Sequence, residues 1–397
     1  MIYEFVRRFF YNSFNLSVSK FPPKQHAVIV GGEPQLELEV LADKDYKFYF
    51  VCFGEKGDSL YWLRDWLNVF SDFNIKILVV LRSKELQDWI FENYPSVDSV
   101  TVSGFQAVVE LYKVTASTKL ALYPINSMYN HMFVRLTSVR HVFIGHGDSD
   151  KLSSANKVLR MFDEIWCAGQ AQVDRMLNQD FDCRSLRLRK VGRPGLLRLI
   201  ADSESEKVKE NKLLYLPTWE GSDERWDYSS VAIIDEVIES IAINTDLTMN
   251  VRLHPFTGRR IKSLKEKILT TKKSYSGSDK VVFSGTEKPL IDVLSDYDYF
   301  ICDISSVVTE CLALGRPIFL YKTCCNSVKI AKSNISLESF CYTFSGLDEL
   351  NKKLKLVLGG DDYKVVKRAE AAEYFIGLEE TRNGTFKELV SEQVVFD

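Results

Sequence analysis

The sequence predicts an α/β protein built from two doubly wound domains. Short apolar strands alternate with amphipathic helical stretches, the alternation stops at one polar stretch, and it then starts again. The 397 residues are enough for two domains with substantial cores. Ligands of such folds bind beyond the carboxyl ends of the strands, so the residues that follow each strand are the candidates for a site.

The first domain is predicted over residues 1–200. Amphipathic stretches at 60–70 and 84–93 have apolar residues at helical spacing, and they lie between candidate strands. The alternation indicates a parallel sheet covered by helices. The candidate strands are residues 47–53, 75–81, 99–102, 119–123, 141–145, 164–167 and 186–191.

The polar stretch at 201–212, ADSESEKVKENK, is predicted to link the domains, and a solvated helix is the alternative. The second domain is predicted over residues 213–362. Residues 363–397 are helical in pattern and could pack back across the cleft between the domains. The candidate strands are residues 213–216, 249–253, 281–284, 299–302 and 317–320.

The composition argues against a nucleic-acid partner, against disulfides and against a membrane-spanning segment. Charged residues make up 26 % of the chain and the formal net charge is −3, so no overall basic field favours nucleic acid. The eight cysteines form no Cys-x-x-Cys pair, and most lie in apolar stretches, which indicates reduced core thiols in a cytosolic protein. No apolar run reaches about 18 residues, so no bilayer-spanning segment is predicted.

The N-terminal stretch MIYEFVRRFFYNSF is predicted to be a basic, aromatic helix. Such a helix can lie in a membrane interface, which would place the protein in the cytoplasm and on the inner face of the cell membrane. A helix packed on its own domain or on a partner subunit fits the pattern slightly better. The apolar residues at helical spacing are Ile2, Phe5, Val6, Phe9 and Phe10, with Arg7 and Arg8 between them.

The most informative stretch is residues 299–321, YFICDISSVVTECLALGRPIFLY. An apolar strand ends at Asp303, Ser305 and Ser306 follow, and a helix runs to Gly315 before a second apolar strand. The unpaired N–H groups and the dipole at such a helix start favour a phosphate. Plain helix capping by aspartate and serine is the alternative.

Two histidines follow predicted strands. His146 lies between Gly145 and Gly147, which let a ligand approach the backbone, and a strand-end histidine is well placed as a general base. His254 follows Arg252 on the same face of a strand, where a cation and an imidazole can hold a diphosphate. A turn histidine with a satisfied ring and a solvent-exposed strand end are the alternatives.

Two further patterns carry weaker signals. Thr218 follows the first strand of the second domain and could donate a hydrogen bond to a phosphate. Asp-x-Asp pairs, which can hold a metal–nucleotide complex but also occur by chance, are found twice. These pairs are Asp148 with Asp150 and Asp296 with Asp298.

A basic stretch lies near the predicted domain junction. A run of this kind is usually a solvated face, and it can also attract an anionic polymer. Its members are Arg184, Arg187, Arg189, Lys190, Arg193 and Arg198.

Five motifs taken in order resemble the CDP-glycerol glycerophosphotransferase family of wall teichoic acid primases and polymerases and related capsule polymerases. They are HG at 146–147, GRP at 192–194, LPTWE at 216–220, RLHP at 252–255 and DISSVVTECLALGRPIFLY at 303–321, so the resemblance spans roughly residues 140–325. It implies a GT-B fold, in which two Rossmann-like domains face a cleft. It also implies transfer of glycerol phosphate or ribitol phosphate from a CDP-activated donor to an acceptor hydroxyl, with release of CMP.

The resemblance assigns roles residue by residue. His146 matches the family histidine thought to act as the base, and Arg252 and His254 match residues that meet the donor diphosphate. The donor-binding turn is matched by Asp303, Ser305 and Ser306.

Two departures from the family pattern fit a divergent branch with a different polyol or sugar. The family motif Trp-His-Gly-Thr-Pro-Leu-Lys is here Gly-His-Gly-Asp-Ser-Asp-Lys. We expect its Gly147, Asp148 and Lys151 to be acceptor-side or supporting residues. The family motif Pro-Thr-Trp-Arg is here Pro-Thr-Trp-Glu, so Glu220 is interpreted as replacing a cation.

We expect no obligatory cofactor, because protein donors could neutralise the diphosphate, and a divalent metal stays an alternative. The expected partners are a CDP-activated polyol donor, a glycan or lipid-linked polymer acceptor and, as a further candidate, a membrane surface; the oligomeric state is open. Two other functions stay open. One is a GT-B glycosyltransferase that uses a nucleotide-sugar, and the other is a non-catalytic nucleotide-binding component of a polymer-assembly complex.

Overall fold

The computed structural model describes residues 29–30, 41–42, 44–54, 56–73, 75–151, 154–204, 209–325 and 328–395. The predicted N-terminal helix and residues 205–208 of the predicted linker lie outside these ranges. The chain divides into two compact units, of which the first holds Met1–Leu60 and Ile75–Arg140 and the second holds Tyr61–Asn74 and His141–Asp397. The predicted domain boundaries stay predictions.

The first unit is a parallel sheet with one antiparallel edge strand. Its strands run in the order β1-β4-β3-β2-β5, with β1 antiparallel to β4. All residues of β2 and β3 are buried, as expected for strands covered on both faces. The strands are β1 (Ile29–Val30), β2 (Phe48–Cys52), β3 (Ile77–Leu81), β4 (Asp98–Thr101) and β5 (Leu120–Tyr123). The helices are α4 (Lys84–Asn93), α5 (Phe105–Val114), η1 (Met128–Asn130) and α6 (His131–Val134).

Helix α3 (Lys56–Ser71) begins in the first unit and continues in the second. The second unit also contains three parallel strands in the order β6-β7-β8. These are β6 (Arg140–Phe143), β7 (Glu164–Cys167) and β8 (Arg187–Lys190). The helical segments among and after them are η3 (Lys157–Met161), α7 (Gln170–Leu177), η4 (Pro194–Leu196) and α8 (Leu197–Ser203).

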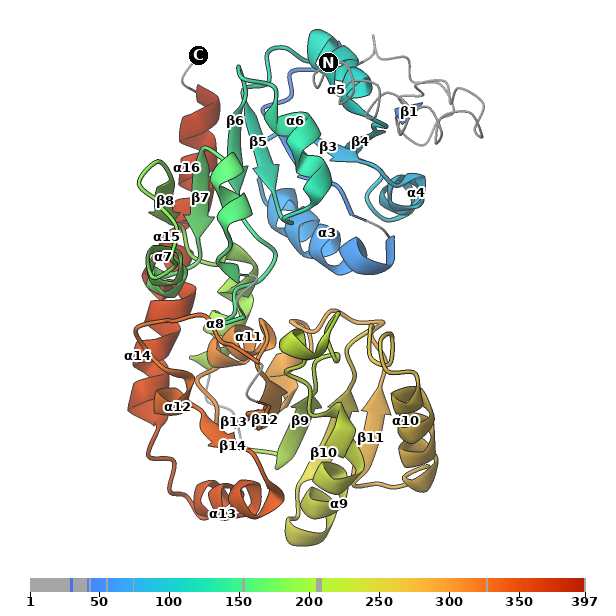
Figure 1. The fold of residues 1–397 in the computed structure, drawn as a ribbon, viewed down its shortest axis with the longest axis vertical. Helices are drawn as coiled ribbons and strands as arrows, with labels where there is room; N and C mark the ends of the chain where they lie inside the picture. The colour runs from blue at the N-terminus through green and yellow to red at the C-terminus, as the bar shows by residue number, and fades with distance from the viewer. Residues whose placement is uncertain are drawn as a thin grey trace, which may run out of the picture. The chain divides into compact units, whose positions relative to one another are not determined.

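The larger sheet of the second unit has six parallel strands in the order β11-β10-β9-β12-β13-β14 (Figure 1). They are β9 (Lys212–Leu216), β10 (Thr248–Arg252), β11 (Val281–Ser284), β12 (Tyr299–Asp303), β13 (Ile318–Tyr321) and β14 (Tyr342–Phe344). The chain winds outward from β9 in one direction and then returns to β12 beside it before winding the other way. The carboxyl ends of β9 and β12 are therefore the switch point where doubly wound sheets bind their ligands.

Alternate residues of these strands enter two separate cores, so both faces of the sheet are covered. Leu214 and Phe300 belong to the core on one face, and Leu213 and Ile301 belong to the core on the other. The helical segments are η5 (Glu224–Trp226), η6 (Val231–Ile233), α9 (Ile234–Asn244), α10 (Ser263–Ser274), η7 (Leu294–Asp296), α11 (Val307–Leu312), α12 (Leu337–Phe340) and α13 (Leu347–Leu358).

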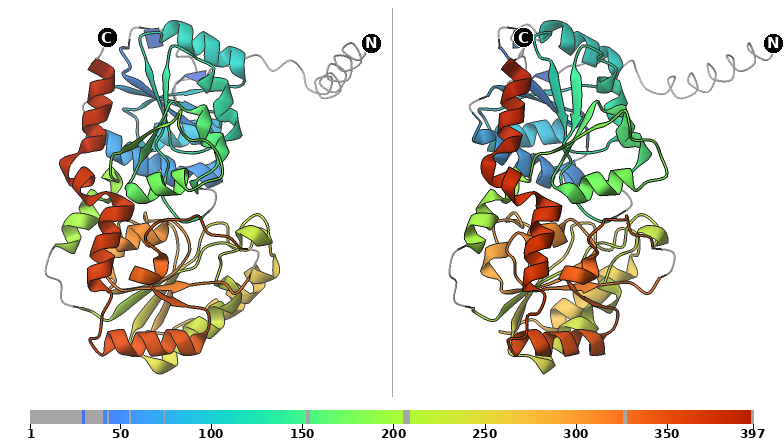
Figure 2. Two further views of the ribbon diagram at one scale, coloured as in Figure 1. Left: turned by 60° about the vertical axis from the view of Figure 1, so that its left-hand side comes forward. Right: turned by 90° about the vertical axis from the view of Figure 1, so that its left-hand side faces the viewer.

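Three helices end the chain and follow one another in a column, drawn in red in Figure 2. They are α14 (Val365–Ile376), α15 (Leu378–Asn383) and α16 (Thr385–Val395). Helix α14 packs on α7, which follows β7, and on α11, which follows β12. It therefore contacts helices associated with both groups of strands in the second unit. Phe386 of α16 packs against Trp66 and Trp166.

The predicted fold class is confirmed, because both sheets are parallel apart from the edge strand β1 and helices connect their strands. Two strands, β1 and β14, were not predicted, since each has three residues or fewer. All eight cysteines lie within the described ranges, none of them forms a disulfide, and six are buried. Among the helices that the structure describes, none combines the length and apolar character needed to cross a membrane.

Candidate active site

The switch point of the six-stranded sheet is held together by Asp303, the last residue of β12. Its Oδ2 accepts hydrogen bonds from the backbone N–H groups of Thr218, at 2.7 Å, and Ser230, at 2.9 Å. Burial raises the pKa of Asp303 to about 7, although these hydrogen bonds and the charge of Lys151 oppose the rise. Asp303 is completely buried, and its carboxylate holds the backbone of Thr218 and Ser230 in place.

Lys151 lies beside Thr218. Its Nζ is 3.4 Å from Thr218 Oγ1 and 5.2 Å from the centre of the Tyr228 ring. Burial lowers the pKa of Lys151 to about 8, and Asp303 opposes that shift. The structure therefore places this predicted supporting residue with the predicted donor residues, where it brings a cation close to the end of β9.

The turn that contains His146 and Gly147 contacts the turn after β12 that contains Ser305 and Ser306. A Cβ atom on Gly147 would lie 2.8 Å from Cβ and 3.1 Å from Oγ of Ser306. Ser305 Oγ donates to the carbonyl of Asp303, and Thr309 Oγ1 donates to the carbonyl of Asp148 at 3.2 Å. Helix α11 has only six residues, so a phosphate bound here would depend on the serine hydroxyls and neighbouring cations more than on a helix dipole.

His146 follows β6 in a turn that two tryptophans of α3 contact. Its ring stacks on Trp62 with a centroid distance of 4.0 Å and an interplanar angle of 29°. Trp66 Nε1 donates a 2.8 Å hydrogen bond to the carbonyl of Gly145, which fixes the start of the turn. His146 is exposed on one side and lines a pocket.

Arg252 ends β10 and His254 lies two residues after it, and only the arginine is a cation. Arg252 Nη2 donates to the carbonyl of Lys288, and its side chain is nearly buried. His254 Nδ1 accepts from the N–H of Phe256 at 3.1 Å. Burial, together with the charge of Lys151, lowers the pKa of His254 to about 4, so the ring is neutral at neutral pH and its Nε2–H remains to donate.

Asp148 and Asp150 form a buried ion-pair network. Arg175 of α7 donates to both carboxylates, at 2.8 Å for Asp150 Oδ1, and Ser333 Oγ donates to the same oxygen at 2.7 Å. The three charged side chains are almost completely buried. Within the described ranges, no group of three or more histidine, cysteine, aspartate or glutamate residues could hold a metal ion.

Glu220 binds the backbone of the loop after β10, a role that the sequence does not predict. Its carboxylate is 1 % exposed and accepts hydrogen bonds from the N–H groups of Gly258, Arg260 and Ile261, at 2.7–3.0 Å. Burial alone would raise the pKa of Glu220, but these hydrogen bonds hold it below the usual value. Glu220 therefore ties the loop after β10 to the end of β9.

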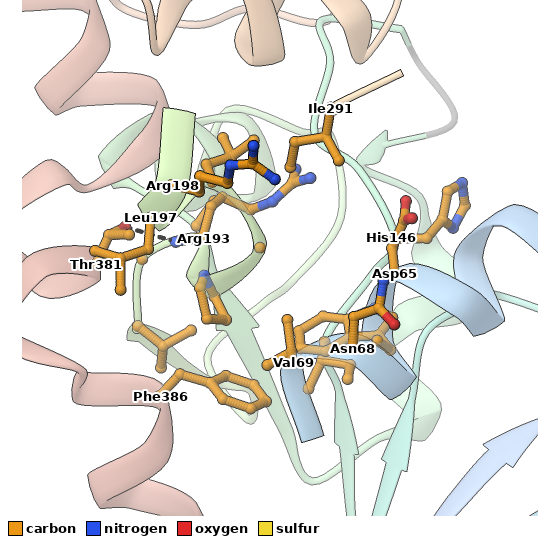
Figure 3. A pocket seen from close by; sticks show the side chains of 18 of the residues that line it. Asp65, Asn68, Val69, His146, Arg193, Leu197, Arg198, Ile291, Thr381 and Phe386 are labelled. Atoms are coloured by element: carbon orange, nitrogen blue, oxygen red, sulfur yellow. Dashed lines mark hydrogen bonds between the residues drawn. The ribbon is translucent and has the colours of Figure 1, made fainter. Parts of the chain in front are cut away.

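A pocket of about 660 Å³ lies next to His146 (Figure 3). Its walls come from α3, the turn after β6, η4, α8, α11, α15 and α16. Phe386 and Val69 lie at one end, and Arg193, Arg198 and Ile291 lie at the other. Thr218, Arg252 and His254 do not line it. No motif in the sequence predicts that residues from these segments meet.

The comparisons with known proteins identify the family. Residues 144–383, more than half of the chain, match the family model described as CDP-Glycerol:Poly(glycerophosphate) glycerophosphotransferase. The chain belongs to this glycerophosphotransferase family. All the predicted site residues, from His146 to Ser306, fall inside the matched segment. The resemblance proposed from the five motifs is therefore confirmed.

Solved structures with the same fold include three that differ strongly in sequence. A TagF wall teichoic acid polymerase variant soaked with CDPG is 12 % identical, with 90 % of this chain and 93 % of that chain covered and a TM-score of 0.57. A Rickettsia africae glycosyltransferase is 9 % identical, with 89 % and 100 % covered and a TM-score of 0.55. Anabaena HepE in complex with UDP is 12 % identical, with 87 % and 100 % covered and a TM-score of 0.55.

These structural similarities show that the glycerophosphotransferase chain has the GT-B fold. They do not identify its substrates. No curated protein matches the sequence.

Proposed function

We propose that the protein transfers a polyol phosphate, glycerol phosphate or ribitol phosphate, from a CDP-activated donor to a hydroxyl of a cell-surface glycan or of a teichoic- or capsule-type polymer. The description of its family names a poly(glycerophosphate). The observation that carries the proposal is the contact between Gly147 and Ser306, because it brings the turn with the candidate base against the candidate phosphate turn.

The donor diphosphate would lie at the carboxyl ends of β9, β10 and β12. Arg252 and Lys151 would supply positive charge, and neutral His254 would donate a hydrogen bond from Nε2. Hydroxyls of Thr218, Ser305 and Ser306 are the remaining candidate donors. Because these groups can neutralise a diphosphate, we propose that no metal is obligatory.

The reaction requires one base and one leaving group. His146 would take the proton of the acceptor hydroxyl while that oxygen forms a bond to the phosphorus that carries the polyol. The bond from this phosphorus to the bridging oxygen would break, and CMP would leave with the electron pair. The products are a new phosphodiester, CMP and the proton held on His146. Trp62 would keep the imidazole plane in place during this step.

His146→Ala tests the proposal when the full chain is incubated with CDP-glycerol and poly(glycerophosphate). We expect CMP release to fall by about 10²–10⁴, the usual effect of losing a positioned base. The affinity for CDP-glycerol should stay within a few fold. His131→Ala, which removes an exposed histidine of the first unit, is the matched control and should keep full activity. Turnover close to wild type in His146→Ala would exclude His146 as the base.

A further inference from the structure

The pocket beside His146 contains charged side chains that the proposed reaction does not use. Arg193 precedes η4, Arg198 lies on α8, Asp65 lies on α3 and Glu310 lies on α11. Figure 3 shows the two arginines extending from one side of the pocket, with Asp65 and His146 on the opposite side. The pocket therefore offers both cations and carboxylates to whatever enters it.

Arg193 has an unused hydrogen-bond donor. Its backbone N–H is fixed by Thr381 Oγ1 at 2.8 Å, so the residue is anchored at its main chain. Its Nη1 atom is buried and has no hydrogen-bond partner among the described residues. A buried donor without a partner is unfavourable, so an anionic oxygen of a ligand that reaches it would be bound favourably.

Glu310 connects the pocket to the donor turn. It lies four residues after Ser306, so the two side chains share one face at the start of α11. Burial raises the pKa of the Glu310 carboxyl to about 7, while the charges of Arg193 and Arg252 oppose that rise. A carboxylate in this place can accept hydrogen bonds from the hydroxyls of a polyol.

The remaining walls suit the carbon skeleton of a polyol chain. Phe73, Phe386 and Leu197 supply apolar surface, and the volume of about 660 Å³ is within the range of pockets that enclose a ligand of several building blocks. The donor residues at the end of β10 do not line the pocket, whereas His146 and Gly147 do. The pocket therefore opens on the side of the candidate base.

We propose that this pocket binds the acceptor, that Arg193 binds a phosphate of that acceptor, and that Glu310 accepts hydrogen bonds from its hydroxyls. The proposal rests on the proposed function, because it places the acceptor hydroxyl next to His146. Arg193 is then a residue that selects a phosphate-bearing polyol over a neutral glycan. Neither Arg193 nor Glu310 takes part in binding the CDP group.

Binding of sn-glycerol 3-phosphate, with glycerol as the neutral probe, tests the proposal by calorimetry on the full chain. Wild type should bind sn-glycerol 3-phosphate at least about tenfold more tightly than glycerol, and Arg193→Gln should lose about tenfold or more of that affinity. Glu310→Gln should weaken binding of both probes. Arg184→Gln is the matched control, because Arg184 is 91 % exposed and lies outside the pocket.

CDP-glycerol titrations of the same variants separate the two proposals. Arg193→Gln and Glu310→Gln should keep the wild-type affinity for CDP-glycerol. If wild type fails to bind CDP-glycerol, the proposed function fails, whatever the acceptor probes show. If sn-glycerol 3-phosphate binds Arg193→Gln as tightly as wild type, or binds no better than glycerol, the assignment of Arg193 is wrong even with intact donor binding.

Discussion

The contact between the histidine turn and the donor turn can be tested by adding one methyl group. In Gly147→Ala the new Cβ would lie 2.8 Å from Ser306 Cβ, well inside the separation of about 3.5–4.0 Å at which carbon atoms attract. Overpacking of this kind costs about 1–3 kcal/mol, and the lower entropy of the unfolded alanine chain offsets about 0.4–1 kcal/mol. We expect a net loss of about 1–2 kcal/mol in the free energy of unfolding.

The second variant removes the atoms that clash. Ser306→Gly deletes Cβ and Oγ, and because the Ser306 side chain makes no capping hydrogen bond, the substitution should cost only a few tenths of a kcal/mol. In the double variant, the loss caused by alanine at 147 should largely disappear. The coupling between the two sites should therefore be about 1 kcal/mol or more.

Thermal unfolding followed by circular dichroism measures both effects. At about 2–4 °C per kcal/mol for a large domain, Gly147→Ala should lower Tm by roughly 2–8 °C. Gly195→Ala is the control, because its new Cβ would meet only Val69 at an ordinary 3.8 Å. A Gly147→Ala protein as stable as wild type, or strictly additive effects in the double variant, would refute the contact.

Four further predictions concern the site and its surroundings. Arg252→Ala should weaken CDP-glycerol binding by about tenfold or more in calorimetry, because a charge-assisted contact is lost; unchanged affinity would remove Arg252 from the donor site. Lys151 loses its charge as the pH rises through about 8, so donor affinity should fall over that range, and by less in Lys151→Met; equal pH profiles would contradict this role. Activity should survive EDTA in a CMP-release assay, and complete loss restored by Mg²⁺ would show a required metal. In liposome flotation, the membrane interpretation of the N-terminal stretch predicts that the full chain binds anionic vesicles and that a chain lacking residues 1–14 does not; if both stay in solution, that interpretation is wrong.

The strands could be predicted because burial on both faces forces an almost continuous apolar run. The runs that became β3 and β12 show this directly, since every residue in them is buried. The same argument placed His146, His254 and Asp303 at strand ends. Parallel strands bring their carboxyl ends to one edge of a sheet, so residues that follow separate strands meet there.

The partners of those residues could not be predicted, because they come from segments whose approach depends on the packing of whole helices. Asp148 and Asp150 appear in the sequence as an Asp-x-Asp pair, yet both are bound by Arg175 from α7. In the sequence Glu220 stands where the family motif has a cation, yet its carboxylate accepts hydrogen bonds from a loop about 40 residues later. Hydrophobic periodicity shows which face of an element is buried, but not which polar group will lie opposite.

The nucleotide released from CDP-glycerol tests the central claim most directly. The full chain is incubated with CDP-glycerol and poly(glycerophosphate), and the nucleotide and the new phosphodiester are quantified together by ³¹P NMR. Attack at phosphorus predicts one CMP for each phosphodiester formed, with no CDP. Release of CDP, or transfer that occurs only with UDP- or GDP-sugars, would contradict the claim and indicate cleavage of a carbon–oxygen bond instead.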